Sequence, residues 1–473
     1  MRFTDVLGIA KQYLLLGTIC GMFLILLFLC GYFLLYKKWM KGTKRISGWR
    51  TVLWFAFILY IIVVLGATLG SRGGWYENSL NLHLFSSYKE AWNSFSAKEW
   101  RNLILNIAMF MPLGIFLPFL FRKCRKFWVT YLLGFCASVT IEVLQLLTKR
   151  GITELDDIFN NTLGAMIGYG FFFIGFAWVQ SRKNRQRMAH KWKVVCLQLP
   201  LAVSVIGFLL VFGIYESREL GNLSISYNYK VDMSDITLRA KCDLSDAGEK
   251  ETVYQTKKYS SDETLDFAKD YFSALGTDVD EAQNDIYEDT VVYYSQDRNY
   301  NLWVDFLGES YHFTDFTLLE KDGVEKLTQK EITDILKQYN ITIPVEADFS
   351  EEGNGSYQIS ADMIEEDDGL LNGTCDITVV EGDKLSSIYN NLIQYSEYKK
   401  SDILSEKEAY EKLEQGKFLL YAYDTDIREM EVNSVSISYE MDSKGFYQPV
   451  YVFGVVYNDD TEIKGNIEVP AIR

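Results

Sequence analysis

Residues 138–164 read S-V-T-I-E-V-L-Q-L-L-T-K-R-G-I-T-E-L-D-D-I-F-N-N-T-L-G, beginning inside one apolar segment and ending inside the next. Ser138, Glu142 and Gln145 are spaced i, i+4 and i+7, so on a helix they form one polar stripe. Ionisable groups are costly at membrane depth, so they indicate a buried site or a contact between helices. After a short loop, the second apolar segment opens with Asp156, Asp157, Asn160 and Asn161.

The chain consists of two parts with opposite charge. From Glu216 onward there are 23 Lys and Arg against 55 Asp and Glu, a net charge of −32. Subtraction from the totals of 47 and 63 leaves 24 against 8 for residues 1–215, a net charge of +16. This contrast predicts a membrane domain, residues 1–215, followed by an acidic soluble domain, residues 216–473.

Six segments of the first part are long and apolar enough to cross a bilayer, which takes roughly 20 residues each. The first is too long for the apolar core of a signal peptide, and no small-residue cleavage pattern follows it, so we expect it to remain in the mature protein. We predict an α-helical polytopic membrane domain with six transmembrane helices, at residues 13–36, 51–70, 103–121, 127–147, 158–179 and 194–214.

The charge of the loops predicts the orientation of these spans. The loops within 37–50, 122–126 and 182–193 are strongly basic, whereas loops 71–102 and 148–157 mix their basic residues with acidic ones. Basic loops stay in the cytoplasm. We therefore predict a multi-pass protein of the cell membrane, with the lipid bilayer as its partner and with both termini and the acidic domain outside the cytoplasm.

This topology brings polar residues of three consecutive spans to one depth in the outer leaflet. Asn106 lies near the outer start of the third span, Glu142 near the outer end of the fourth, and Asp157 at the outer start of the fifth. Arg150, in the loop, is close enough in sequence to pair with these carboxylates. We favour a polar pocket open to the outer leaflet, with the candidate residues Asn106, Ser138, Glu142, Gln145, Arg150, Asp156, Asp157 and Asn161.

Each of these features also has a purely structural explanation. Asp157 and either Asn160 or Asn161 could simply cap the fifth helix, where acidic groups suit the helix dipole. Glu142 could form a hydrogen bond between helices that has no further role. The motif Gly164-x-x-x-Gly168 is more typical of close helix packing than of ligand contact.

Four motifs in this region occur in a fixed order across three spans. They are N106-I-A-M-F-M-P-L-G114, S138-V-T-I-E-V-L-Q145, R150-G-I-T-E-L-D-D157 and N161-T-L-G164-A-M-I-G168. Together they cover roughly residues 55–180 and resemble the VanZ-like family of bacterial membrane proteins. This chain has Glu154 where an aspartate is expected in many members, so the charge is kept.

The resemblance implies a protein of the cell membrane. The founding type of the family is linked to resistance to the glycopeptide teicoplanin. It implies no settled biochemical activity. Carried over position by position, it selects for testing Asn106, Glu142, Gln145, Arg150, Asp157 and Asn161.

The acidic part changes to a pattern of short strands and capped helices. Three capping-box signatures each precede an amphipathic run, at Ser260/Glu263, Thr328/Glu331 and Ser405/Glu408. Alternating strand-like sequence follows each of them. A helix followed by strands, occurring about three times, predicts an α+β fold built from weak repeats.

The end of this part resembles a second group of proteins, less closely. The carrying segments are E408-A-Y-E-K-L-E-Q-G-K-F418, Q448-P-V-Y-V-F453 and I467-E-V-P-A-I-R473. They look like YycH/YycI-type regulatory domains, and PepSY-like modules share the pattern of helix and sheet. The likeness implies an extracytoplasmic domain that binds or regulates, with an envelope protein as a candidate partner.

Other kinds of site find little support in the sequence. The three histidines are far apart, so we expect no zinc site, and we expect no cofactor because no glycine-rich phosphate loop stands out. Net negative charge argues against binding to nucleic acid. Cys242 and Cys375 allow one disulfide in the acidic part, although two unpaired thiols are the simpler interpretation.

Three classes of function remain open. The leading hypothesis is protection of the cell envelope against glycopeptides, by binding or masking a lipid-linked wall precursor, another wall component or the glycopeptide itself. A membrane enzyme acting on a lipid-phosphate or lipid-linked substrate is the alternative, with Glu142 and Asp157 as acid/base or metal-binding groups. A purely structural or regulatory role is the third. We favour binding over catalysis.

Overall fold

The chain divides into two units, and the boundary falls between Glu219 and Leu220. Each unit is considered by itself. The predicted first span, 13–36, and Arg150 lie outside the described residues. The computed structural model describes residues 48–70, 80–149, 151–184, 191–287, 289–308, 310–324, 326–366, 369–420, 427–458 and 464–473.

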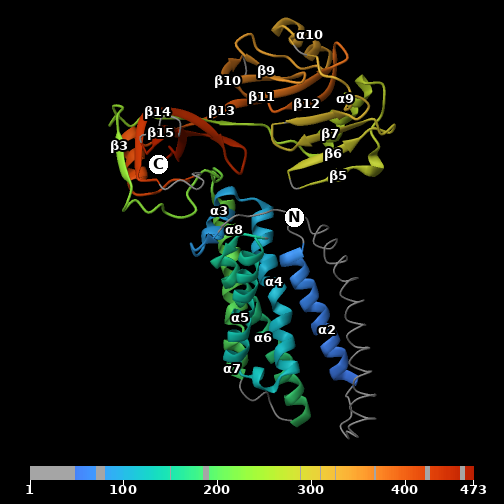
Figure 1. Cartoon of the computed structure of the whole chain (residues 1–473), viewed down its shortest axis with the longest axis vertical. Helices are drawn as coiled ribbons and strands as arrows, with labels where there is room; N and C mark the ends of the chain where they lie inside the picture. Colours follow the sequence, from blue (N-terminus) through green and yellow to red (C-terminus); the bar gives the residue numbers. More distant parts are fainter. Residues whose placement is uncertain are drawn as a thin grey trace. The chain divides into compact units, whose positions relative to one another are not determined.

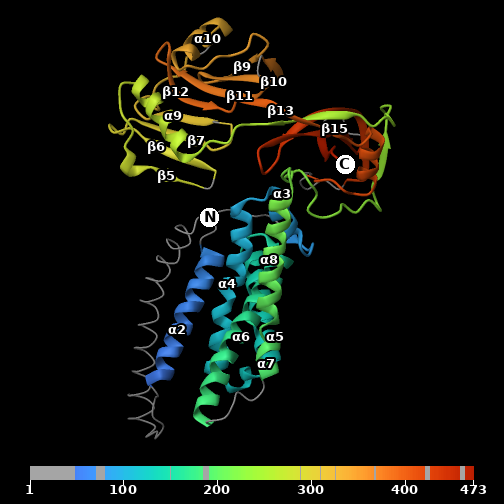
Figure 2. The ribbon, with the colours of Figure 1, turned by 180° about the vertical axis from the view of Figure 1, so that it is seen from behind.

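Long apolar helices that run side by side make up most of the first unit (Figures 1 and 2). Among the described residues, five are long and apolar enough to cross a membrane, so this unit lies in a lipid bilayer. They are α2 (Gly48–Leu65, continued by the π-helical turn Gly66–Gly70), α4 (Ala97–Leu120), α5 (Phe127–Thr148), α6 (Leu155–Asn184) and α8 (Leu199–Ser217). The shorter elements are β1 (Leu80–Asn81), α3 (Ser86–Ser94), a 3₁₀ turn (Arg122–Arg125), β2 (Thr153–Glu154) and α7 (Lys191–Cys196).

Two helices begin at residues other than those expected, for local reasons. Helix α4 starts before the predicted segment 103–121, because the Ser96 hydroxyl accepts a hydrogen bond from the Glu99 N–H at 3.2 Å and caps the helix. The predicted segment 194–214 is divided between α7 and α8. Pro200 lies in the first turn of α8, where a proline is tolerated because the backbone N–H of that turn has no partner within the helix. In the interior of one continuous helix the same proline would remove a hydrogen bond and break the helix.

Helices α4 and α6 approach each other so closely that only glycine fits at the contact. A Cβ atom added to Gly164 would overlap the carbonyl oxygen of Ile107, and one added to Gly168 would overlap that of Met111. Small residues at such spacing let helix backbones touch within a membrane. The Gly164-x-x-x-Gly168 motif therefore packs α6 against α4.

The second unit consists mainly of strands (Figure 1). Its helices alternate with groups of strands along the chain. Its helical elements are α9 (Ser261–Ala274), a 3₁₀ turn (Glu281–Gln283), α10 (Gln329–Gln338) and α11 (Glu406–Glu414). The strands are β3 (Thr237–Ala240), β4 (Lys250–Gln255), β5 (Asp285–Ile286), β6 (Thr290–Tyr294), β7 (Tyr300–Asp305), β8 (Tyr311–Asp315), β9 (Asp348–Gly353), β10 (Ser356–Glu366), β11 (Gly369–Val380), β12 (Lys384–Asn390), β13 (Ile393–Asp402), β14 (Glu429–Met441), β15 (Phe446–Tyr457) and β16 (Lys464–Pro470).

Hydrogen bonds join these strands in the order β3-β14-β15-β4-β13-β11-β12-β8-β7-β6-β5, with β10 beside β11, β9 beside β10 and β16 beside β15. The pairs are antiparallel except for β14 with β3. A helical membrane domain followed by an α+β domain was predicted, and the structure confirms this fold class.

The helices of the second unit pack on two separate hydrophobic cores. Phe272 of α9 and Leu336 of α10 lie in one core, and Leu413 of α11 lies in the other. Cys375 is buried in the first core, whereas Cys242 packs against the second, and both are free thiols. Each cysteine therefore serves as a small hydrophobic residue.

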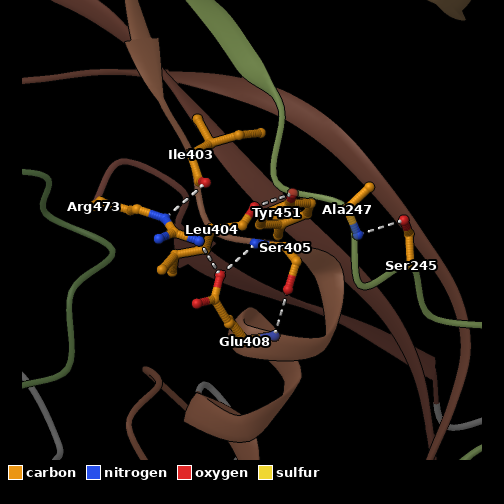
Figure 3. A network of polar contacts seen from close by, with 8 residues as sticks. All are labelled: Ser245, Ala247, Ile403, Leu404, Ser405, Glu408, Tyr451 and Arg473. Atoms are coloured by element: carbon orange, nitrogen blue, oxygen red, sulfur yellow. Dashed lines mark hydrogen bonds and ion pairs between the residues drawn. The ribbon is translucent and has the colours of Figure 1, made fainter.

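All three predicted capping boxes form. In each, the hydroxyl at the N-cap accepts from the N–H of the glutamate three residues on, and that glutamate accepts from the N-cap backbone. Figure 3 shows the third of these, where Glu408 also pairs with the Arg473 guanidinium at 2.7 Å. The same guanidinium donates to the Ile403 carbonyl at 3.1 Å, and the Tyr451 hydroxyl donates to the Leu404 carbonyl at 2.6 Å.

Candidate functional site

Polar side chains from three helices of the first unit gather in one group. We call this group the polar cluster: Asn106 of α4, Ser138, Glu142 and Gln145 of α5, and Asp156, Asp157, Asn160 and Asn161 of α6. Ser138, Glu142, Gln145, Asp156, Asn160 and Asn161 are each at most 3 % exposed. The cluster contains every predicted pocket residue that the structure describes, and Asn106 and Asp157 are its partly exposed members.

Helix α6 presents its polar residues in two directions, because consecutive residues on a helix point about 100° apart. Asp157 and Asn161, four residues apart, address the neighbouring spans. The Asn106 amide donates to Asp157 Oδ1 at 2.5 Å, and the Asn161 amide donates to Ser138 Oγ at 3.0 Å. These bonds link α6 to α4 and to α5.

Asp156 faces a different partner, the N-terminus of α3. Its two carboxylate oxygens accept from the backbone N–H groups of Phe85, at 2.5 Å, and Ser87, at 2.8 Å. The first N–H groups of a helix have no partner within it and attract negative charge. Asp156 thus caps α3 from more than sixty-five residues away along the chain.

Asn160, one turn after Asp156 on the same face of α6, also binds α3. The Tyr88 hydroxyl donates to Asn160 Oδ1 at 2.5 Å, and the Ser87 hydroxyl donates to Glu154 Oε2 at 3.1 Å. Strand β1 pairs with β2 in parallel. We call residues 80–94 the covering segment, because β1 and α3 are joined by these bonds to the polar end of α6.

Burial keeps Tyr88 a hydrogen-bond donor. Together with the neighbouring Asp156 carboxylate, it raises the pKa of the Tyr88 phenol to about 12. The hydroxyl therefore stays protonated at neutral pH and can donate to Asn160.

Helix α5 reaches two further elements through its polar stripe. Glu142 Oε2 accepts from the Glu154 N–H at 3.2 Å, and the Thr153 hydroxyl donates to the Glu142 carbonyl, also at 3.2 Å. The Gln145 amide donates to the Thr68 carbonyl at 3.1 Å, in the π-helical turn after α2. The stripe thereby joins α5 to α2 and to the loop before α6.

Three polar atoms of the cluster are buried and have no hydrogen-bond partner among the described residues: Gln145 Oε1, Asn160 Nδ2 and Asn161 Oδ1. A buried polar group without a partner costs about 1–3 kcal/mol, so native proteins rarely retain one without a reason. In each residue the other end of the amide is engaged. The cluster therefore has unused capacity for a bound polar group.

The carboxylates of the cluster are all engaged by hydrogen bonds within the protein. Its carboxylates at positions 142, 156 and 157 all accept hydrogen bonds from the protein itself. Within the described part of the chain, no group of three or more His, Cys, Asp or Glu side chains is arranged to hold a metal ion. The groups of the cluster that could bind a ligand are therefore the side-chain amides of Gln145, Asn160 and Asn161.

Sequence reasoning missed the covering segment and the part played by Asn160. The spacing of Asp156 and Asn160 placed both on one face of α6, but the residues that face them come from a stretch interpreted as a loop. Phe85 precedes α3 with a left-handed backbone, φ 67°, and its side chain forms no cap. Because the cap comes from α6 instead, the local sequence carries no start signal for α3.

Comparison with known proteins finds relatives of the region that contains this cluster. Residues 23–177 match the VanZ/LLP1 family. The membrane region is VanZ-like. It is also similar to protein VanZ of Enterococcus faecium, with 24% identity over 126 residues, which is 26% of this chain and 72% of that protein. The VanZ-like region includes the whole polar cluster and the covering segment, and it ends within α6.

Proposed function

We propose that the protein protects the bacterial cell envelope against glycopeptides of the teicoplanin type, by binding or masking a lipid-linked or wall component. The observation that carries this proposal is a set of three buried polar atoms that have no hydrogen-bond partner in the described part of the chain, inside the VanZ-like region. Polar side chains are costly at membrane depth, and a bundle of apolar helices could pack without them. The resemblance to VanZ supplies the biological setting.

The proposal places the polar cluster, the covering segment and the acidic second unit outside the cytoplasm. The support is the charge of the loops, since basic residues concentrate between alternate spans. In this orientation the cluster lies in the outer leaflet, where lipid-linked wall precursors are exposed. The second unit then docks to a wall component or to another envelope protein.

Orientation is tested by thiol labelling of intact cells with a reagent that does not cross membranes. Asp383→Cys places a thiol on the exposed turn between β11 and β12, and Lys123→Cys places one in the 3₁₀ turn after α4. We expect labelling above the wild-type background at position 383 in intact cells, and at position 123 only after lysis. The reverse pattern would refute the proposed topology.

Function is tested by teicoplanin sensitivity of a susceptible host that expresses the wild type, Glu142→Ala, Asp157→Ala or a chain truncated after Glu219. Expression and membrane insertion are checked for each. We expect the wild type to raise the inhibitory concentration and both point variants to lose that protection while inserted. The truncated chain shows whether the acidic unit is needed. If the wild type protects no better than an empty vector, the proposed function is wrong.

A further inference from the structure

We propose that the covering segment is a lid over the polar cluster, and that the group it admits is an uncharged headgroup rich in hydroxyl or amide groups, as in a sugar. This inference rests on the proposed binding role of the cluster, and it adds the class of ligand and the route of access. It is carried by the three partnerless amide atoms and by the contacts that close the site.

The partnerless atoms define what a ligand must offer. Gln145 Oε1 and Asn161 Oδ1 are acceptors, whereas Asn160 Nδ2 is a donor. The orientation of the Gln145 amide follows from its neighbour, because the Thr68 carbonyl can only accept and so faces the amide nitrogen. A headgroup that meets all three atoms must therefore both donate and accept hydrogen bonds.

Three headgroup chemistries differ sharply against this pattern. A hydroxyl or acetamido group donates and accepts, so it can meet amide oxygens and an amide N–H together. A phosphate dianion offers acceptors only, and it would leave both amide oxygens buried without donors. An ammonium group offers donors only and would leave Asn160 Nδ2 without an acceptor. Each unmet atom keeps its penalty of about 1–3 kcal/mol.

The covering segment is the part of the enclosure that can move at least cost. Further along α6, backbone contacts at Gly164 and Gly168 leave no room for a ligand between α6 and α4. At α6 the covering segment is instead held by exchangeable hydrogen bonds to Asp156, Asn160 and Glu154. The pairing of β1 with β2 and the ring contacts of Phe85 and Tyr88 with Phe159 add to them. Water can replace the hydrogen bonds once the segment lifts.

Aromatic contacts supply a hinge at the far end of α3. The Phe95 ring stacks on Tyr215 of α8, with centroids 3.2 Å apart, and Trp92 meets the same ring edge-on at 6.3 Å. These contacts keep the C-terminal end of α3 against α8. Opening therefore moves the end that carries Phe85, Ser87 and Tyr88, which is the end over the cluster.

Asn160 couples the lid to the ligand. One side of its amide accepts from Tyr88 and the other side is the partnerless donor. Lifting the lid frees Oδ1, so the whole amide becomes available to a headgroup. When the lid closes again, Tyr88 reclaims Oδ1 and fixes the amide in the orientation that presents Nδ2 to the ligand.

The test uses the full chain in lipid nanodiscs and three probes with one tail: dodecyl N-acetylglucosaminide, dodecyl phosphate and protonated dodecylamine, whose primary ammonium carries N–H donors. Radiolabelled glycoside is bound, and the unlabelled probes compete, with empty nanodiscs as the measure of partition into lipid. We expect saturable binding of the glycoside and competition by the charged probes that is weaker by about tenfold or more, equivalent to one lost hydrogen bond.

Two variants separate the ligand from the lid. Gln145→Met keeps the length of the side chain but removes the partnerless acceptor, so glycoside affinity should fall by about tenfold. Tyr88→Phe keeps the ring contacts with Phe85 and Phe159 but frees Asn160, so association and dissociation should both become faster. Thr140→Val is the control, since Thr140 is an exposed α5 residue bonded only to its own helix at Cys136.

The outcomes distinguish this inference from the proposed function. Tighter binding of the phosphate, or equal binding of all three probes, overturns the ligand class even where the cluster variants lose teicoplanin protection. Unchanged rates in Tyr88→Phe, with unchanged hydrogen exchange of α3, overturn the lid. Selective glycoside binding by a protein that gives no protection supports the inference and leaves the proposed function as the part that failed.

Discussion

Helix starts in the two units of this protein are capped from different distances along the chain. In the second unit, each capping box joins residues three positions apart, such as Ser405 and Glu408. In the membrane unit, Asp156 bonds Phe85 across 71 residues, and Asn106 bonds Asp157 across 51. Local pairs finish an element, whereas remote pairs assemble a site and leave some of its atoms free.

The largest effect should come from filling the contact between α4 and α6. Gly168→Leu places a side chain where a Cβ already overlaps the Met111 carbonyl, so the helices must separate and the remote pairs must break. We expect loss of several kcal/mol and a marked drop in the detergent melting temperature. Gly175→Leu is the matched control, because nothing lies within 4 Å of a Cβ there. Equal melting of both variants would refute the tight contact.

Removing a remote cap should have the next largest effect. In Asp156→Asn the side-chain oxygen can accept from only one of the Phe85 and Ser87 N–H groups, and the charge at the helix N-terminus is lost. We expect the covering segment to lose about 2 kcal/mol, seen as faster hydrogen exchange across α3. The control is Ser96→Ala, whose effect should stay within the first turn of α4. Unaltered exchange in α3 would show that Asp156 does not hold it.

Removing a local cap should cost less and remain local. Ser405→Ala removes the hydroxyl that accepts from the Glu408 N–H at 3.2 Å. We expect a loss of about 1 kcal/mol, detected as faster exchange of α11 alone. Faster exchange that extends to α9 or α10 would contradict the contrast between local and remote pairs.

Smallest should be two opposite pH effects in the second unit. Burial, with a contribution from the Glu468 carboxylate, raises the pKa of Glu440 to about 7 from 4.5. The folded state then binds a proton more tightly than the unfolded chain, so stability falls as pH rises from 4.5 to 7. Glu440→Gln should therefore be more stable than the wild type near pH 8, by about 1 kcal/mol after solvent screening, and equal to it near pH 4.

Glu408 should behave in the opposite way. The Ser405 N–H lowers the pKa of its carboxyl, and Arg473 adds to the effect. Its contribution is therefore present above the unfolded pKa and is lost as pH falls through the folded one. Glu408→Gln should be less stable than the wild type at neutral pH, with a difference that vanishes in strong acid. Melting curves across the pH range check both variants, and parallel profiles would contradict the assigned causes.

Contacts between residues close in sequence could be predicted, whereas contacts between residues far apart in sequence mostly could not. The three capping boxes, the five described spans and the packing of Gly164 and Gly168 each depend on short spacings, and sequence pattern revealed them. The convergence of three spans placed Asn106, Glu142 and Asp157 in one region. The contacts of the covering segment could not be predicted in this way. The sequence around Asp156 does not indicate a bond to Phe85, and the sequence around Tyr88 does not indicate a bond to Asn160.

The remote cap of α3 also has a consequence for biosynthesis. Residues 85–88 leave the ribosome well before Asp156 and Asn160, and three further apolar helices must be inserted before α6 can supply those groups. Because chains fold progressively from the N-terminus during synthesis, the start of α3 remains uncapped during that interval. Closure of the covering segment must therefore wait until α6 is in place. A chain that fails to insert α6 cannot close it, and its exposed segment would present quality-control proteases with a direct sign of incomplete insertion.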